Sequence, residues 1–154
     1  MREFRVCAVL LAVLTVGAAL FWAPRAACEV TALVPVETLI VDLEDGTVTV
    51  EGEGVRGKGT DWASAMEDLR QSASGTVFLE TADRVLITER AAAILPELCR
   101  DSTLRPAVQL FFLRGSPKDG VFEFAVAKES TATVRKPEHI PVIIPEGDGR
   151  FRIE

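Results

Sequence analysis

Cys99 and His139, the only histidine of the chain, are residue types from which a nucleophile and its general base can be built. In such a pair a thiolate attacks the substrate and an imidazole takes up the proton. The local sequence favours neither role, because Cys99 falls on the apolar side of a predicted helix and His139 lies in a loop between two prolines. We therefore predict a small, buried thiol and a solvated loop histidine, and we assign no catalytic residue.

Carboxylates are the second group that could do acid–base chemistry. Helix capping and solvated helix faces account for those that lie on or near predicted helices, namely Asp61, Glu67, Asp68, Asp83, Glu89 and Asp101. The acidic run 146–149 lacks the spaced ligand series of an EF-hand and is predicted to be a turn. With one histidine and no C-x-x-C pair, the chain offers no zinc site, so no metal is predicted.

Residues 52–57 read Gly-Glu-Gly-Val-Arg-Gly, which is a literal G-x-G-x-x-G. A dinucleotide fold needs this motif inside a parallel β-α-β unit, with the last glycine in the first turn of the helix. Here the preceding strand belongs to a predicted hairpin, and the helix begins later. The next residues, Gly57-Lys58-Gly59, lack the Ser or Thr of a P-loop. We predict a flexible strand-to-helix connection and no cofactor.

The hydrophobic pattern predicts a mixed α/β (α+β) domain over residues 29–154, a single small domain with two main helices on one mixed sheet. Asp45-Gly46 is a typical hairpin turn between strands at 36–43 and 47–51. Thr60 is the predicted cap of a helix with an apolar stripe, and Thr88 of a second helical region broken at Pro96. Further strands are predicted at 76–79, 85–87, 108–113, 121–127, 140–144 and 150–153.

Residues 1–28 are predicted to be a signal peptide or a membrane anchor, formed as an apolar helix. An uninterrupted apolar run covers 6–23, with Arg2 and Arg5 before it, so the rest of the chain is expected outside the cytoplasm. Three fates remain open: a retained anchor, lipidation, and cleavage with secretion. The sequence Ala26-Ala27-Cys28 resembles the end of a lipobox, which makes Cys28 a candidate for lipidation. Alternatively, Cys28 and Cys99 are candidates for a disulfide in an oxidising compartment.

The domain after the N-terminal segment is acidic. Removing residues 1–28 leaves 14 basic against 22 acidic residues, a net charge of −8. Binding to nucleic acid requires clustered Lys and Arg, so no nucleic-acid partner is expected.

The middle of the chain, residues 51–116, resembles the N-terminal domain of the C subunit of spore germinant receptors, a family of membrane-anchored lipoproteins. The similarity begins with a glycine–threonine segment that opens a helix, followed by two short strands, an acidic-capped helix, and a Leu-x-x-Leu-like run before a strand and a glycine. In this chain these motifs are residues 57–60, 77–79, 85–87, 88–91, 94–101 and 110–115.

This resemblance implies a non-enzymatic, membrane-tethered domain that binds other membrane components. We therefore expect a membrane-associated extracytoplasmic interaction module, an accessory of the spore or cell envelope with a membrane-protein partner. Two alternatives stay open: a small secreted or envelope hydrolase that uses acidic residues, and a small-ligand sensor whose glycine-rich segment 52–59 moves on binding.

Overall fold

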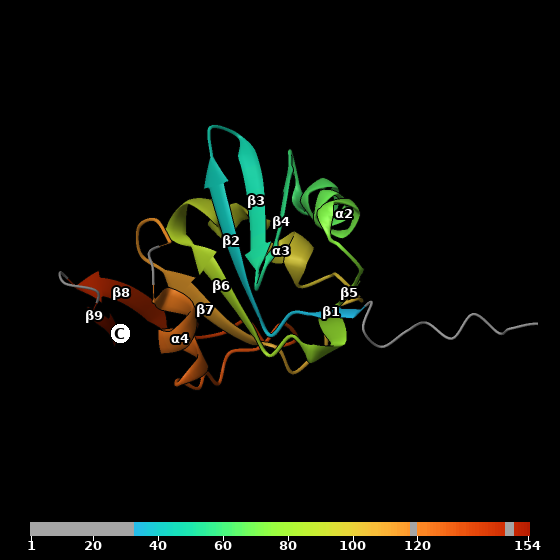
Figure 1. Ribbon diagram of the computed structural model, residues 1–154. Helices are drawn as coiled ribbons and strands as arrows, with labels where there is room; N and C mark the ends of the chain where they lie inside the picture. The colour runs from blue at the N-terminus through green and yellow to red at the C-terminus, as the bar shows by residue number, and fades with distance from the viewer. Residues whose placement is uncertain (1–32, 118–119, 147–149) are drawn as a thin grey trace, which may run out of the picture. The chain divides into compact units, whose positions relative to one another are not determined.

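The chain that follows the N-terminal apolar segment is organised around one seven-stranded mixed sheet (Figure 1). The computed structural model describes residues 33–117, 120–146 and 150–154, all within the unit Thr31–Glu154. The predicted N-terminal helix and Cys28 lie outside these residues. The predicted fold class, a small domain of mixed α and β structure, is confirmed.

The sheet has the strand order β4-β3-β2-β6-β7-β8-β9. Its four middle strands, β2, β6, β7 and β8, run parallel to one another, whereas β3 and β9 run antiparallel to their inner neighbours. Each side of the parallel core therefore ends in a hairpin. The strands are β2 (Thr38–Glu44), β3 (Thr47–Gly52), β4 (Val55–Gly59), β6 (Arg84–Thr88), β7 (Gln109–Leu113), β8 (Val142–Glu146) and β9 (Arg150–Ile153).

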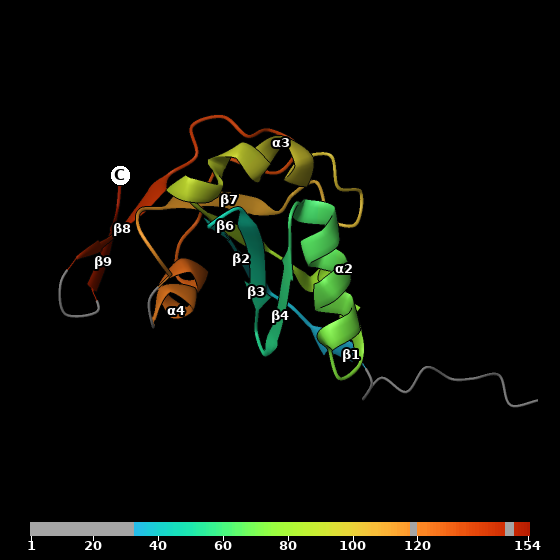
Figure 2. The ribbon, with the colours of Figure 1, turned by 90° about the horizontal axis from the view of Figure 1, so that it is seen from above.

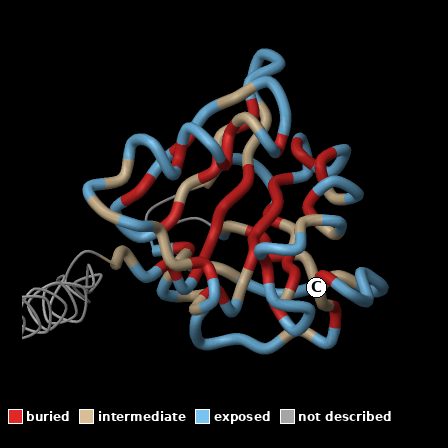
Figure 3. The backbone as a smooth tube through the Cα atoms, turned by 90° about the vertical axis from the view of Figure 1, so that its right-hand side faces the viewer, coloured by how far each residue is buried: buried red, intermediate tan, exposed pale blue. Residues whose placement is uncertain are grey.

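Burial along the strands follows from their place in the sheet (Figure 3). The first four residues of β2 and the last four of β6 are all buried, as expected for parallel strands covered on both faces. In β3, by contrast, buried residues alternate with exposed or half-buried ones, because only one of its faces is covered.

The helices lie on opposite faces of the sheet (Figure 2). One face packs against α2 (Trp62–Ser72), the 3₁₀ turn Glu89–Ile94 and α3 (Leu95–Leu98). The other face packs against α4 (Val121–Val126), whose Val121 and Ala125 belong to a second apolar cluster with Ile40 of β2 and Phe111 of β7. Because α4 is short, it covers only part of its face.

The glycine-rich segment is a second hairpin, which corrects the predicted flexible connection. Strand β4 pairs antiparallel with β3, and Gly54 makes the turn between them with φ +75°. A Cβ atom at Gly57 or at Gly59 would overlap the backbone of α2. The glycines are therefore needed for close packing of strand and helix.

The structure corrects the predicted cap of α2, and it confirms Thr88 at the N-cap position of the next helical turn without a capping bond from its side chain. Asp61, rather than Thr60, caps α2: its carboxylate accepts the Ser64 backbone N–H at 2.7 Å, and the Ser64 hydroxyl accepts the Asp61 N–H in return. This reciprocal capping holds the pKa of Asp61 below its ordinary value, chiefly through the Ser64 N–H. Thr88 precedes the 3₁₀ turn, but its hydroxyl bonds to Asp42 across the sheet.

The strand predicted at 121–127 is wrong, because these residues form α4. The alternating sequence Val-Phe-Glu-Phe-Ala-Val fits a period of two, yet Val121 and Ala125 also fall one helical turn apart and both are buried. The parallel strands β7 and β8 need a crossover connection, which α4 supplies.

Two smaller features complete the domain. Strands β1 (Leu33–Pro35) and β5 (Thr76–Phe78) form a separate parallel pair, next to the 3₁₀ turn Leu79–Thr81. The stretch before β8 packs on the domain: Ala132 and Val134 are buried, and the Val134 N–H bonds to the carbonyl of Val108.

Candidate functional site

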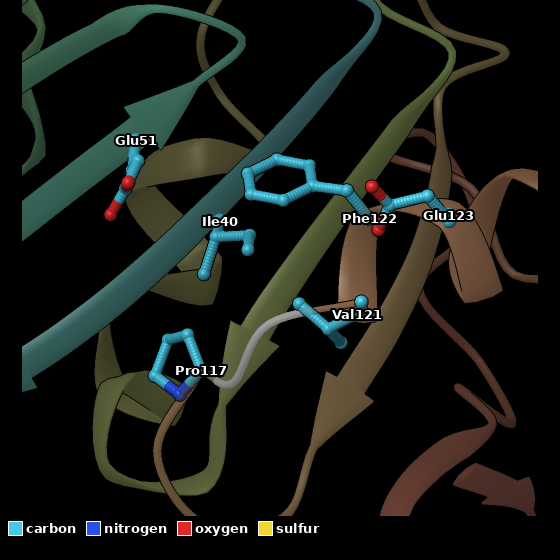
Figure 4. Close-up of a pocket in the computed structure, with 7 residues that line it drawn as sticks. Ile40, Glu51, Pro117, Val121, Phe122 and Glu123 are labelled. Atoms are coloured by element: carbon cyan, nitrogen blue, oxygen red, sulfur yellow. The ribbon is translucent and has the colours of Figure 1, made fainter. Parts of the chain in front are cut away.

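A cleft lies on the part of the sheet that α4 leaves uncovered (Figure 4). It consists of two adjacent hollows of about 320 and 160 Å³, which share Ile40, Glu51 and Pro117. We call it the sheet-face cleft. Its lining residues are Ile40, Asp42, Glu44, Thr49, Glu51, Arg56, Pro117, Gly120, Val121, Phe122 and Glu123.

The floor of the sheet-face cleft is apolar. Ile40 of β2 and Val121 of α4 are buried, and Phe122 is half-buried. Figure 4 shows the Phe122 side chain reaching from α4 toward β2, with Ile40 beside it. A ligand lying here would cover the half-buried Phe122 and Pro117, because Ile40 and Val121 are only 2% and 1% exposed.

The walls of the cleft are acidic. Its lining contains the carboxylates of Asp42, Glu44, Glu51 and Glu123 and the guanidinium of Arg56, while Arg90 pairs with Asp42 and Glu44. Glu51 and Arg56 are exposed or half-exposed and 3.8 Å apart, so their attraction is weakened by solvent. In Figure 4, Glu51 and Glu123 stand on opposite sides of the apolar floor.

Asp42 is fixed in place at the carboxyl end of β2. One of its oxygens accepts the Thr88 hydroxyl at 2.6 Å, and the other accepts Nη2 of Arg90 at 2.7 Å. Arg90 also contacts Glu44 at 3.4 Å and Oγ of Ser116 at 3.3 Å. Because both Asp42 oxygens are engaged, this carboxylate braces β2 against the segment after β6 and the loop after β7.

The sheet-face cleft includes Asp42 and Glu44 at the carboxyl end of the parallel strand β2 and Pro117 in the loop after β7, and open α/β sheets commonly bind their ligands at this end of their strands. Its combination of an apolar floor with a surplus of carboxylates suits a partner that presents an apolar side chain beside a cationic group.

A second cluster joins α2 to the residues after α3. Trp62 is buried, and its indole N–H donates to Oδ2 of Asp101 at 2.7 Å. Burial raises the pKa of Asp101 more than any other single cause does, but hydrogen bonds from Thr103 and Trp62 and the charge of Arg70 together hold it below its ordinary value. Trp62 begins the apolar stripe predicted for this helix, and the stripe is buried.

Cys99 and His139, the first candidates from the sequence, are not assembled into a site. Cys99 is partly buried against the main apolar cluster, and burial raises the pKa of its thiol. His139 is exposed, with φ +55°, and among the described residues neither side chain forms a hydrogen bond. Because Cys28 lies outside the described residues, its lipidation and its disulfide with Cys99 stay predictions.

The six carboxylates named from the sequence each have a structural partner. Glu67 accepts from Gln71, Asp68 accepts the Lys58 N–H, and Asp61 caps α2. Asp83 is paired with Arg105, Glu89 with Arg114, and Asp101 with Trp62.

The sequence predicts neither a metal site nor a nucleotide site. Within residues 33–117, 120–146 and 150–154, no three His, Cys, Asp or Glu residues are grouped to hold a metal ion. In the same part of the chain no helix is long and apolar enough to cross a membrane. Most of the acidic turn at 146–149 lies outside the described residues.

Fold and cleft together define a small α+β domain with a polar-walled cleft on one sheet face. Comparison with models of known protein families, with curated proteins and with solved structures finds no match. The resemblance to the C subunit of germinant receptors therefore stays a prediction from the sequence.

Ile40, Asp42, Glu51 and Phe122 were not predicted as site residues from the sequence. One signal was present: Asp42 stands inside the otherwise apolar strand sequence Thr-Leu-Ile-Val-Asp-Leu. A carboxylate at such a position requires a buried partner or borders a site.

Proposed function

We propose that this protein is a membrane-associated extracytoplasmic interaction module, an accessory of the spore or cell envelope, which binds a membrane-protein partner through the sheet-face cleft. The observation that carries the proposal is the hollow beside α4, in which the half-buried Phe122 lies between the carboxylates of Glu51 and Glu123. Partly open apolar surface rimmed by charged groups is typical of a binding surface.

Membrane association rests on the sequence of residues 1–28, with its apolar run and basic start. Either a retained helix or an acylated Cys28 would tether the domain. The tether would hold the cleft near membrane proteins and raise their effective concentration.

Charge defines the partner's chemistry. The domain carries a net charge of −8 beyond residue 28. Among the described residues Asp42 and Glu44 pair with Arg90, so Glu51, which lies 3.8 Å from the exposed Arg56, and Glu123 are the wall carboxylates open to a partner. A partner segment with Lys or Arg next to an apolar side chain would pair with Glu51 and Glu123 and cover the half-buried Phe122.

The test compares the full chain with its Glu51→Lys variant in membranes of cells that make the protein, after gentle crosslinking and purification. We expect a discrete membrane protein with the wild type and at least a tenfold loss of it with Glu51→Lys. Glu67→Lys is the matched control, because Glu67 makes the same charge change from the exposed side of α2 on the other sheet face. Equal recovery with all three chains, or no membrane protein with the wild type, would refute the proposal.

Fractionation and intact mass test the tether separately. A membrane-bound chain of full length, or one that begins at an acylated Cys28, supports it. A soluble and unmodified shorter form would overturn the tether, and a secreted enzyme or ligand sensor would become the better explanation.

A further inference from the structure

The two edge strands of the sheet, β4 and β9, differ in how their outward backbone groups are covered. At the β4 edge, side chains of α2 occupy the outward backbone groups: Asp68 accepts the Lys58 N–H at 2.8 Å, and the Ser72 hydroxyl donates to the Arg56 carbonyl at 2.8 Å. An edge covered in this way does not offer a free template for another strand.

The β9 edge has no such cover among the described residues. Glu154 exchanges backbone hydrogen bonds with Val142, so residues 150, 152 and 154 direct their backbone groups toward β8. The N–H and C=O groups of Phe151 and Ile153 therefore point away from the sheet. The Ile153 side chain is 37% exposed, which makes it one of two large apolar side chains that are exposed in the described part of the chain.

Strand β9 is nevertheless held in a strand conformation. The Phe151 ring packs on Phe124 of α4 with centroids 5.3 Å apart. Arg152 pairs with Glu146 at 3.4 Å and with Glu154 at 2.9 Å. Preorganisation of this kind lowers the entropy cost of adding a further strand.

We propose that β9 pairs antiparallel with β9 of a second copy of this chain, which joins two sheets across a two-fold axis. The sequence Arg-Phe-Arg-Ile-Glu is complementary to itself in this pairing. With Phe151 opposite Ile153 of the second copy, the outward backbone groups form hydrogen-bonded residue pairs, and an aromatic side chain meets a β-branched one on the α4 face.

The same register places Arg150 opposite Glu154 of the second copy, and the symmetry repeats this ion pair. Arg152 faces its own copy across the axis, where Glu146 and Glu154 already neutralise it. The interface is small, so the dimer is expected to be weak in dilute solution and to benefit from confinement at a membrane. The pairing does not use the sheet-face cleft and stands independently of the proposed function.

The test is oxidative crosslinking of the full chain carrying Arg152→Cys. In the proposed register the two Cβ atoms at position 152 lie about 5 Å apart, close enough for a disulfide after small adjustment. Arg150→Cys is the matched control on the same strand and face, because its two copies would lie about 14 Å apart. We expect covalent dimer with Arg152→Cys well above the wild-type background, and background alone with Arg150→Cys.

A second variant separates pairing from loss of the fold. Ile153→Pro removes an outward N–H and leaves the hydrogen bonds between β8 and β9 intact. Added to Arg152→Cys, it should reduce the covalent dimer at least tenfold. The proposal is overturned if both cysteine variants crosslink equally, if the dimer survives Ile153→Pro, or if Arg152→Cys stays monomeric while its thiol reacts readily with a maleimide.

Discussion

The indole N–H of Trp62 donates a 2.7 Å hydrogen bond to Oδ2 of Asp101, which fastens the first turn of α2 to the residues that follow α3. Asp101 also accepts the backbone N–H and the hydroxyl of Thr103. A single carboxylate thus joins two segments that lie 39 residues apart in the chain.

Asp101 should make stability depend on pH. Its pKa is lower in the folded chain than its ordinary value of 3.8, so its stabilising effect is present above that pH and is lost as the pH falls below it. Asp101→Asn should cost about 1 kcal/mol at pH 7, since the site is partly open to solvent, and should flatten the loss of stability below pH 3.8. Denaturant unfolding at several pH values measures both effects, and the exposed Glu129→Gln serves as control.

Gly57 should tolerate no side chain. A Cβ atom there would overlap the Ala65 carbonyl and Leu69, so Gly57→Ala should cost about 2 kcal/mol or displace α2. Gly54→Ala meets open space and should cost only about 1 kcal/mol for its positive φ. Denaturant unfolding of the two variants decides the matter, and an equal loss in both would contradict close packing of β4 on α2.

Removal of the side chains that cover β4 should leave backbone groups of this edge strand free to pair with another chain. The double variant Asp68→Ala/Ser72→Ala frees the Lys58 N–H and the Arg56 carbonyl, so it should self-associate faster and lose about 1 kcal/mol. Light scattering follows the association. The faster association should persist when Ile153→Pro is added, because the β4 edge and not the β9 edge is responsible. Scattering equal to that of the wild type would contradict the proposal that Asp68 and Ser72 cover β4.

The Cys99 thiol should be slow to react at neutral pH. Burial raises its pKa, so its thiolate is scarce at pH 7. The rate of alkylation by iodoacetamide, followed by mass spectrometry of the Cys99 peptide, should rise with pH and reach half of its maximum above pH 9.0. Fast labelling at pH 7 would contradict this prediction, and a Cys28–Cys99 disulfide would appear as a linked peptide that alkylates only after reduction.

The sequence was most informative where the determinants are local. Asp45 and Gly46 both adopt positive φ, as their residue types suggest, and the stripe of Trp62, Ala65, Met66 and Leu69 is buried along α2. Prediction was poorer where tertiary packing decides. The segment 121–127 fits a strand by itself and becomes a helix because parallel strands β7 and β8 require a crossover.

The sheet-face cleft was hidden from the sequence for the same reason. Ile40, Glu51 and Phe122 come from β2, β3 and α4, and they meet only when α4 is helical and packs beside the hairpin. Alternation within β3 showed that Glu51 would leave the core, but no local pattern indicated what would stand opposite it.

Site-specific photocrosslinking from the sheet-face cleft tests the central claim most directly. A benzophenone side chain at position 51 of the full, membrane-associated chain should give one discrete adduct with a membrane protein, weakened by high salt because acidic walls attract a cationic partner. The same probe at position 67, on the exposed side of α2, should give no such adduct. Equal adducts at both positions, or none at position 51, would contradict the account.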